Sequence, residues 1–255
     1  MKIVLIGAGR LATHLGPALR EAGHDVVQVF SRTLTSAEAL ARKVGAEAVT
    51  TMDKVVTTAD VYVCALTDTA LPVLLPDLCK GRENALFLHT AGSMPLEVFC
   101  GKARRYGVLY PMQTFSKERQ LDFSEIPVFI EADSPETLTV VNSIACSISR
   151  RVTPLSSEAR RHLHLSAVFA CNFANHCYAL AADVLAAHHI PFETLLPLID
   201  ETARKVHELP PHEAQTGPAI RYDEQVIRRQ AAMLDGLPRE IYELMSRSIH
   251  ESSKQ

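Results

Sequence analysis

Short apolar runs alternate with longer segments of helical periodicity through the first part of the chain. Several of these runs are apolar throughout and do not alternate with polar residues, as is typical of strands buried on both faces of a parallel sheet. They lie at residues 2–6, 25–30, 46–50, 61–66, 85–90, 107–111 and 127–132. Strands that alternate with helices predict an α/β fold with a doubly wound, mostly parallel sheet.

The helical segments carry start and stop signals of their own. Residues 10–22 place leucines at helical spacing and are followed by Gly23, which suits a left-handed cap. Thr35 and Glu38 have the spacing of a capping box. Ser134 stands before a proline, which is a further helix start signal. The sequence predicts a helix at each of these places.

The pattern changes after residue 152. Residues 156–190 predict one uninterrupted helix that is apolar around most of its circumference, so it has to be buried. Three further helices are predicted at residues 191–209, 223–234 and 239–250. About 100 residues do not easily bury such a helix alone. We expect a first domain at residues 1–153, an all-α C-terminal domain at residues 154–255, and a homodimer formed through the long helix.

Composition and charge exclude several classes of protein. The 255 residues carry a net charge of -3, and basic residues occur in isolated pairs such as Arg150 and Arg151. This leaves no basic patch for nucleic acid or for an acidic membrane surface. The cysteines form no C-x-x-C motif and most lie in apolar runs, which predicts reduced thiols and a cytoplasmic protein.

The N-terminus does not have the pattern of a signal peptide. Its apolar run breaks at Gly7 and is followed by Arg10 instead of a cleavage site. No segment approaches the roughly 18 apolar residues that a membrane span requires. We expect neither export nor membrane insertion.

A glycine motif joins the first predicted strand to the first predicted helix. Gly7, Gly9 and Ala12 form a G-x-G-x-x-A pattern after an N-terminal strand, and a second strand follows within about 30 residues. Gly7 permits a tight turn, and Gly9 lets the backbone approach a pyrophosphate at the helix N-terminus. This context predicts a dinucleotide site; the alternative is a tight turn that binds nothing.

The end of the second predicted strand indicates which dinucleotide binds. An acidic side chain there would accept hydrogen bonds from the ribose hydroxyls of NAD, but this chain has Ser31, Arg32 and Thr33. The positive charge of Arg32 and the hydroxyls of its two neighbours suit the 2′-phosphate of NADP(H). The alternative is a solvated arginine on a loop. The predicted cofactor-binding residues are Gly7, Ala8, Gly9, Arg10, Leu11, Ser31, Arg32, Thr33, Leu66 and Thr67.

Three polar side chains follow the fifth and sixth predicted strands. His89 and Ser93 lie in the segment HTAGS, and Gln113 lies in YPMQTFS. The carboxyl ends of parallel strands border the ligand crevice, so each is a candidate catalytic residue. Each has a structural alternative: a core histidine, a helix cap, and a loop amide that braces the backbone.

Further candidates lie in the helical part. At 100° per residue His164 and Asn172 fall within about 80° of each other on the long helix. Buried polar groups need partners, and a substrate, a nicotinamide or a neighbouring backbone would serve. Arg221, on a turn between helices, could clamp a substrate carboxylate or pair with Asp223 to cap the next helix. His162 points away from His164, and no metal site is expected.

These motifs together carry a family resemblance. From KIVLIGAGRLATHL through SRT, HTAGS, YPMQTFS, HLSAVFACNFANH and TGPAIRYD, the chain resembles the Rossmann-like NADP oxidoreductases that have a C-terminal helical domain of unknown function. They are similar in plan to pyrroline-5-carboxylate reductases, 6-phosphogluconate dehydrogenases and 3-hydroxyacid dehydrogenases. The resemblance implies a nucleotide domain, a helical dimer-forming domain and an NADP(H)-dependent oxidoreductase.

One departure from those relatives bears on mechanism. The hydroxyacid dehydrogenases place a Lys one turn before an Asn on the long helix, but this chain has Val168 one turn before Asn172. His164 becomes the best proton donor for a small, anionic carbonyl substrate, whereas an imine that arrives protonated needs no strong acid. We expect Asn172 and Gln113 to orient the substrate and Arg221 to bind its charge. Two alternatives stay open: an NADP-binding sensor or assembly protein without turnover, and hydride exchange with a deazaflavin.

Overall fold

The computed structural model describes residues 1–254 and forms two compact units. Unit 1 spans Met1–Cys171 and unit 2 spans Asn172–Gln255. The division falls within the long helix, because hydrogen bonds tie the first turns of that helix to the sheet. The boundary expected between residues 153 and 154 marks a change of sequence pattern, and as a domain boundary it stays a prediction.

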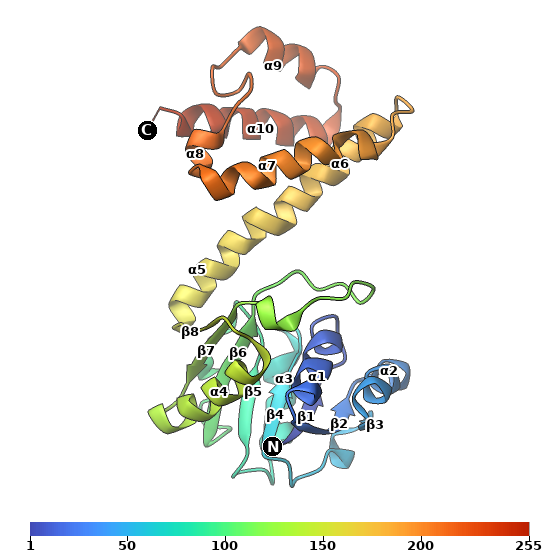
Figure 1. Ribbon diagram of the computed structural model, residues 1–255, viewed down its shortest axis with the longest axis vertical. Coiled ribbons are helices and arrows are strands. Elements are labelled where there is room, and N and C mark those ends of the chain that lie inside the picture. Colours follow the sequence, from blue (N-terminus) through green and yellow to red (C-terminus); the bar gives the residue numbers. More distant parts are fainter. Residues whose placement is uncertain (255) are drawn as a thin grey trace. The chain divides into compact units, whose positions relative to one another are not determined.

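Unit 1 is built around an eight-stranded sheet with the order β3-β2-β1-β4-β5-β6-β7-β8 (Figure 1). Its strands are β1 (Lys2–Ile6), β2 (Asp25–Phe30), β3 (Glu47–Val49), β4 (Val61–Cys64), β5 (Leu86–His89), β6 (Arg105–Pro111), β7 (Val128–Ala132) and β8 (Val152–Pro154). Only the pair β6 and β7 is antiparallel. The predicted α/β class with a mostly parallel Rossmann sheet is confirmed. The short strand β8 was not predicted.

Helices cover both faces of this sheet. The face with α1 (Ala12–Glu21), α2 (Leu34–Val44) and α4 (Pro135–Ile148) buries one apolar cluster, which includes Ile3 and Leu5 of β1. The opposite face, with α3 (Ala70–Cys79) and the short helices η1 (Met52–Lys54) and η2 (Leu96–Phe99), buries Val4 and Ile6. Strands that are apolar at every position are explained by this burial from both sides.

The helix signals in the sequence meet different outcomes. Gly23 follows α1 with φ +85°, and Ser134 caps α4 by accepting a hydrogen bond from the amide of Thr137, so both predictions are confirmed. The capping box at Thr35 is wrong. Helix α2 begins earlier, at Leu34, with Thr33 in extended backbone before it, so Thr35 is already helical.

The long helix differs from the predicted one in its middle. It consists of α5 (Ser157–Ala167), a π-helical segment η4 (Val168–Phe173) and α6 (Ala174–Ala186). A π segment has more residues per turn than an α-helix, and such segments are frequent at functional sites. The expectation of one regular helix through residue 190 is therefore wrong, and so is the uniform 100° per residue used to place His164 and Asn172 on one stripe.

Unit 2 is helical (Figure 1). It holds α6, η5 (Phe192–Leu195), α7 (Leu196–Glu208), α8 (Pro211–Ala214), α9 (Glu224–Ala231) and α10 (Gly236–Ser252). Neither α6 nor α7 has a fully buried residue. The single chain thus leaves exposed the apolar surface that the sequence pattern expects to be covered. No helix among residues 1–254 is long and apolar enough to cross a membrane.

Candidate functional site

A cavity of about 670 Å³ lies where β1, β2 and β4 end, on the side of the glycine turn. Several predicted cofactor-binding residues line it: Gly7, Ala8, Gly9, Ser31, Arg32, Thr33, Leu66 and Thr67. Two others, Arg10 and Leu11, lie beside it at the start of α1 and are not part of the lining. The paired ends Ile6–Phe30 and Ile6–Cys64 explain why segments far apart in sequence meet here.

The glycine turn has the shape that a pyrophosphate needs. Gly7 has φ +111°, and a Cβ there would lie 2.2 Å from the carbonyl oxygen of Ala65, so only glycine fits. A Cβ at Gly9 would meet nothing within 4 Å, which leaves open space for a ligand against the backbone. Helix α1 begins after Leu11 without a side-chain cap or an acidic residue in its first turn. The amides of Arg10, Leu11 and Ala12, which have no hydrogen-bond partner among residues 1–254, are available to an anion.

The charge of the cavity is positive. Its lining includes Arg32 and Lys117, and no Asp or Glu is among the described residues that form it. Lys117 comes from the loop between β6 and β7, which a hydrogen bond of 2.8 Å between His14 Nε2 and the carbonyl of Ser116 holds against α1. No signal near the glycine motif could have revealed Lys117. The lining residues missed from the sequence are Phe30, Ser36, Ala65, Thr69, Ala70, Val73, Leu74 and Lys117.

His89 lies in the core. Its side chain is 0% exposed, it stacks on Phe99, and its Nδ1 accepts a hydrogen bond from the amide of Ala91. Burial, followed by the charge of Arg160, lowers the pKa of His89 to about 3, so the ring is neutral. The geometry favours the alternative of a core histidine, because an enclosed ring does not contact a substrate.

Ser93 and Gln113 both make local hydrogen bonds. The hydroxyl of Ser93 donates to the carboxylate of Asp68, which stands between two threonines that line the cavity. It does not cap η2, whose N-cap is Pro95. The side chain of Gln113 accepts from the amide of Thr114 at 2.8 Å, as expected of an amide that braces its loop.

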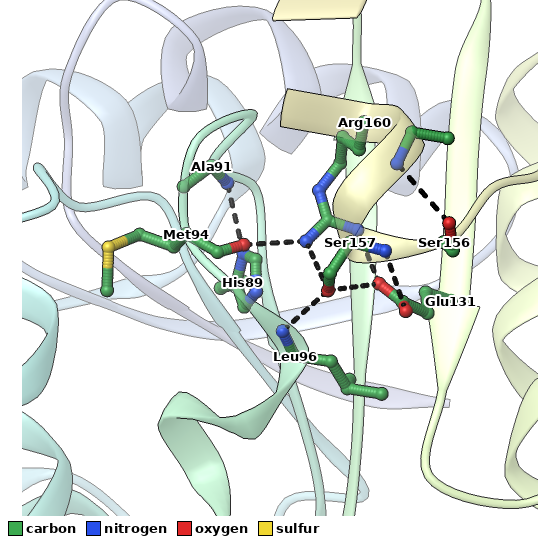
Figure 2. A network of polar contacts seen from close by, with 9 residues as sticks. His89, Ala91, Met94, Leu96, Glu131, Ser156, Ser157 and Arg160 are labelled. Atoms are coloured by element: carbon green, nitrogen blue, oxygen red, sulfur yellow. Dashed lines mark hydrogen bonds and ion pairs between the residues drawn. The ribbon is translucent and has the colours of Figure 1, made fainter. Parts of the chain in front are cut away.

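A buried polar network fixes the start of α5 (Figure 2). The Nη1 atom of Arg160, whose side chain is 1% exposed, lies 2.5 Å from the carboxylate of Glu131 on β7. Its Nη2 donates to the carbonyl of Met94 at 2.6 Å. Ser157 binds the same carboxylate through both its amide and its hydroxyl, and accepts from the amide of Leu96. Helix α5 is thus joined to β7 and to the loop that follows β5.

His164 lies one turn beyond Arg160 on α5. Its Nδ1 is 3.1 Å from the hydroxyl oxygen of Tyr110 on β6. Its Nε2 has no hydrogen-bond partner among residues 1–254 and is not among the nitrogens sealed from solvent. Of the two predicted catalytic histidines in unit 1, His164 is the one with a ring nitrogen that is neither bonded nor enclosed.

Asn172 and Arg221 belong to unit 2, and both are exposed. Asp223 caps α9 by accepting from the amide of Val226, which confirms the capping alternative for that residue. No ion pair joins Arg221 to Asp223 within residues 1–254. The guanidinium of Arg221 is therefore not occupied by this carboxylate.

The chain matches two domain families in sequence. A Rossmann-like domain matches residues 1–111, and a domain of unknown function, DUF2520, matches residues 126–249. The crystal structure of the Bacteroides fragilis protein BF3122, described as a "putative NADP oxidoreductase", is 55% identical, covers 98% of both chains and superposes with a TM-score of 0.94. The chain belongs to this Rossmann-like and DUF2520 family. No protein with a curated description matches it.

Two more distant structures share the fold. An imine reductase from Myxococcus stipitatus in complex with NADP+ is 16% identical, covers 100% of this chain and 93% of its own, and has a TM-score of 0.71. A reductive aminase from Aspergillus terreus in complex with NADPH and ethyl-5-oxohexanoate is also 16% identical, covers 99% of this chain and 97% of its own, and has a TM-score of 0.70. At these identities the likeness is one of fold.

Proposed function

We propose that this chain is an NADP(H)-dependent oxidoreductase that transfers hydride to a small, anionic carbonyl or imine compound. The observation that carries the proposal is the cavity of unit 1, where a glycine turn and a helix N-terminus meet Arg32 and Lys117 without a carboxylate. The relatives support it, since BF3122 is described as a "putative NADP oxidoreductase" and the structures of the two distant enzymes are complexes with NADP+ and with NADPH.

Different residues of the cavity would bind different parts of the cofactor. The backbone at Gly9 and the N-terminus of α1 would hold the pyrophosphate. Arg32, with the hydroxyls of Ser31 and Thr33, would hold the 2′-phosphate. Lys117 adds a second positive charge to the same cavity. When bound, NADPH supplies a hydride with its electron pair and is oxidised to NADP+.

His164 would supply the proton that balances this hydride. As hydride reaches a carbonyl carbon, the electron pair of the double bond moves to oxygen, and the protonated ring gives that oxygen its Nε2 hydrogen. Solvent then returns a proton to the ring. An imine that arrives protonated needs only the hydride. In this proposal Asn172 and Gln113 orient the substrate, and Arg221 binds its negative charge.

The proposal includes a homodimer. Helices α6, α7 and α10 leave large apolar side chains exposed, among them Leu198 at 63% and Leu244 at 56%. A helix that is apolar on most sides is stabilised by packing against other helices, and a second copy offers such a surface. The partners of the chain are then a small substrate, the cofactor and its own copy.

A titration with NADPH and NADH tests the nucleotide site. Arg32→Ala should lower NADPH affinity about 10-fold or more, because a hydrogen bond to a charged group contributes roughly 1.5–3 kcal/mol, and should leave NADH affinity nearly unchanged. Arg42→Ala is the matched control, since Arg42 is exposed on the neighbouring helix α2 and bonds to its own helix at Glu38. Equal affinities of the wild type for the two nucleotides would contradict the proposed NADP preference.

Turnover separates an enzyme from a sensor. NADPH consumption should be measured with a panel of cyclic imines and 2-oxo acids, and any active substrate repeated with His164→Gln and Arg221→Ala. We expect the first variant to lower kcat and the second to raise KM. Tight NADPH binding without consumption, joined to a change in oligomer state, would instead establish the non-catalytic alternative.

A further inference from the structure

Two residues from separate segments of unit 1, Tyr110 and Gly92, lie against the imidazole of His164. Tyr110 lies on β6, His164 on α5, and Gly92 in the loop after β5. The Tyr110 hydroxyl oxygen is 3.1 Å from His164 Nδ1, and the two rings meet edge to face at an angle of 75°. Tyr110 is only 7% exposed, so this hydroxyl lies inside the protein.

Gly92 leaves just enough room for this pair. A Cβ at this position would lie 2.6 Å from Nδ1 of His164 and 2.9 Å from Cζ of Tyr110. Any side chain there would displace one of the two rings. The backbone at Gly92 therefore holds the imidazole from one side while the phenol holds it from another.

A hydrogen bond links the loop beside this pair to the loop that lines the nucleotide cavity. Ser93 follows Gly92 in the chain, and its hydroxyl donates to Asp68. The residues on each side of Asp68, Thr67 and Thr69, line the cavity. One hydrogen bond thus connects the loop under His164 to the loop beside the proposed cofactor.

The phenol can bind Nδ1 in both charge states of the ring. Burial raises the pKa of Tyr110, so its hydroxyl keeps its hydrogen at neutral pH. When the His164 ring is neutral, the buried hydroxyl hydrogen of Tyr110 needs an acceptor. Within residues 1–254 that acceptor is Nδ1 of His164. Towards a protonated ring the hydroxyl oxygen accepts from Nδ1–H instead.

We infer that Tyr110 is a positioning residue that holds Nδ1 of His164 in a hydrogen bond in every protonation state, favours the Nε2–H tautomer of the resting neutral ring, and so leaves Nε2 as the nitrogen that exchanges a proton with the substrate. The inference rests on the proposed function and deepens it. The balance of the reduction is unchanged: the protonated ring loses its Nε2 hydrogen, and the hydrogen left on Nδ1 still binds the phenol until solvent reprotonates the ring. Tyr110 itself transfers nothing.

The first experiment needs no substrate. In ¹⁵N-labelled full-length protein, the imidazole nitrogens of His164 are assigned by their loss in His164→Gln. In the wild type at high pH the hydrogen should reside on Nε2, whereas in Tyr110→Phe both tautomers should be populated and Nδ1 should shift towards an unbonded nitrogen. Tyr106→Phe is the matched control, because Tyr106 lies on the same strand and makes ring contact with Phe99, away from His164.

The second experiment follows turnover. Tyr110→Phe should lower kcat about 10- to 100-fold with little change in KM or NADPH affinity, and should alter the pH profile of kcat. Gly92→Ala, which displaces the ring and removes no polar group, should have a similar effect. Tyr106→Phe should match the wild type.

Failure of the inference and failure of the proposed function are distinguishable. An unchanged tautomer in Tyr110→Phe overturns the inference, whether or not a substrate is found. Unchanged kcat in both Tyr110→Phe and Gly92→Ala overturns it as well. Absence of NADPH consumption by the wild type overturns the proposed function, while the NMR result still decides how Tyr110 holds His164.

Discussion

At the scale of single residues, His89 and His164 show how environment separates two histidines that the sequence offers as catalytic candidates. His89 has 0% exposure and a pKa near 3, whereas His164 has one nitrogen bound to Tyr110 and the other available. Both follow from what packs around the rings. The sequence placed His89 at the end of a predicted strand and His164 on the long helix. It did not show which of the two rings is enclosed in the core.

The buried ring of His89 makes stability depend on pH. Its pKa is about 3 in the folded chain against an ordinary value of 6.5, so the unfolded chain binds more protons between these values. The free energy of unfolding should therefore fall as pH drops below about 6.5, by at most about 1.4 kcal/mol per pH unit. His89→Gln, which keeps an acceptor for Ala91, should flatten this slope and retain any turnover.

The measurement is urea unfolding of both proteins between about pH 5 and 6.5, above the range where most carboxylates titrate. His162→Gln is the control, because His162 is exposed on α5. Equal slopes in the wild type and His89→Gln would show that His89 is not held neutral. Loss of turnover in a well-folded His89→Gln would return His89 to the list of catalytic candidates.

At the scale of elements, local patterns predicted the strands of unit 1 except β8, and most of its helices. Apolar runs in the sequence indicate strands buried on both faces of a sheet. Ser134 caps its helix as predicted. The capping box at Thr35 failed because α2 already begins at Leu34, so Thr35 lies within the helix and not before it. The π segment at Val168–Phe173 also escaped prediction, because local periodicity does not distinguish a wider turn from a regular one.

Contacts between distant segments were the least predictable feature of the site. Lys117 lines the nucleotide cavity and Tyr110 contacts His164. Both contacts depend on the order of strands in the sheet, which positions β6 and the loop after it. The glycine motif and Arg32 were predictable since one short βαβ unit contains them. Residues that join a site from another strand carry no signal of their own in a single sequence.

The network at the start of α5 should contribute strongly to stability. Glu131→Gln should lower the free energy of unfolding by about 3 kcal/mol, because it leaves the buried guanidinium of Arg160 without its counter-charge. Glu125→Gln is the matched control, since Glu125 pairs with two exposed arginines and should cost less than about 1 kcal/mol. Chemical unfolding of the full chain compares them. Equal losses in the two variants would show that burial adds nothing to the Arg160 pair.

At the scale of the whole molecule, unit 2 raises the question of what covers its helices. One cavity of unit 2, of about 560 Å³, is lined mainly by apolar side chains from α6, α10 and the segment before α10. Large exposed apolar surfaces mark interaction sites. The sequence pattern predicted the excess of apolar surface. It does not show the geometry of the surface that packs against these helices.

If a second copy covers this surface, association and stability should change together. Leu198→Asp and Leu244→Asp place a charge on exposed apolar positions of unit 2 and should convert a dimer to a monomer, measured as molar mass by light scattering. Leu34→Asp is the control, because Leu34 is 54% exposed at the start of α2 in unit 1. The wild type should also melt at a higher temperature as its concentration rises, since association stabilises the folded chain by mass action. A monomeric wild type with a concentration-independent melting temperature would contradict the dimer, and it would require unit 2 to remain folded with its apolar helices in water.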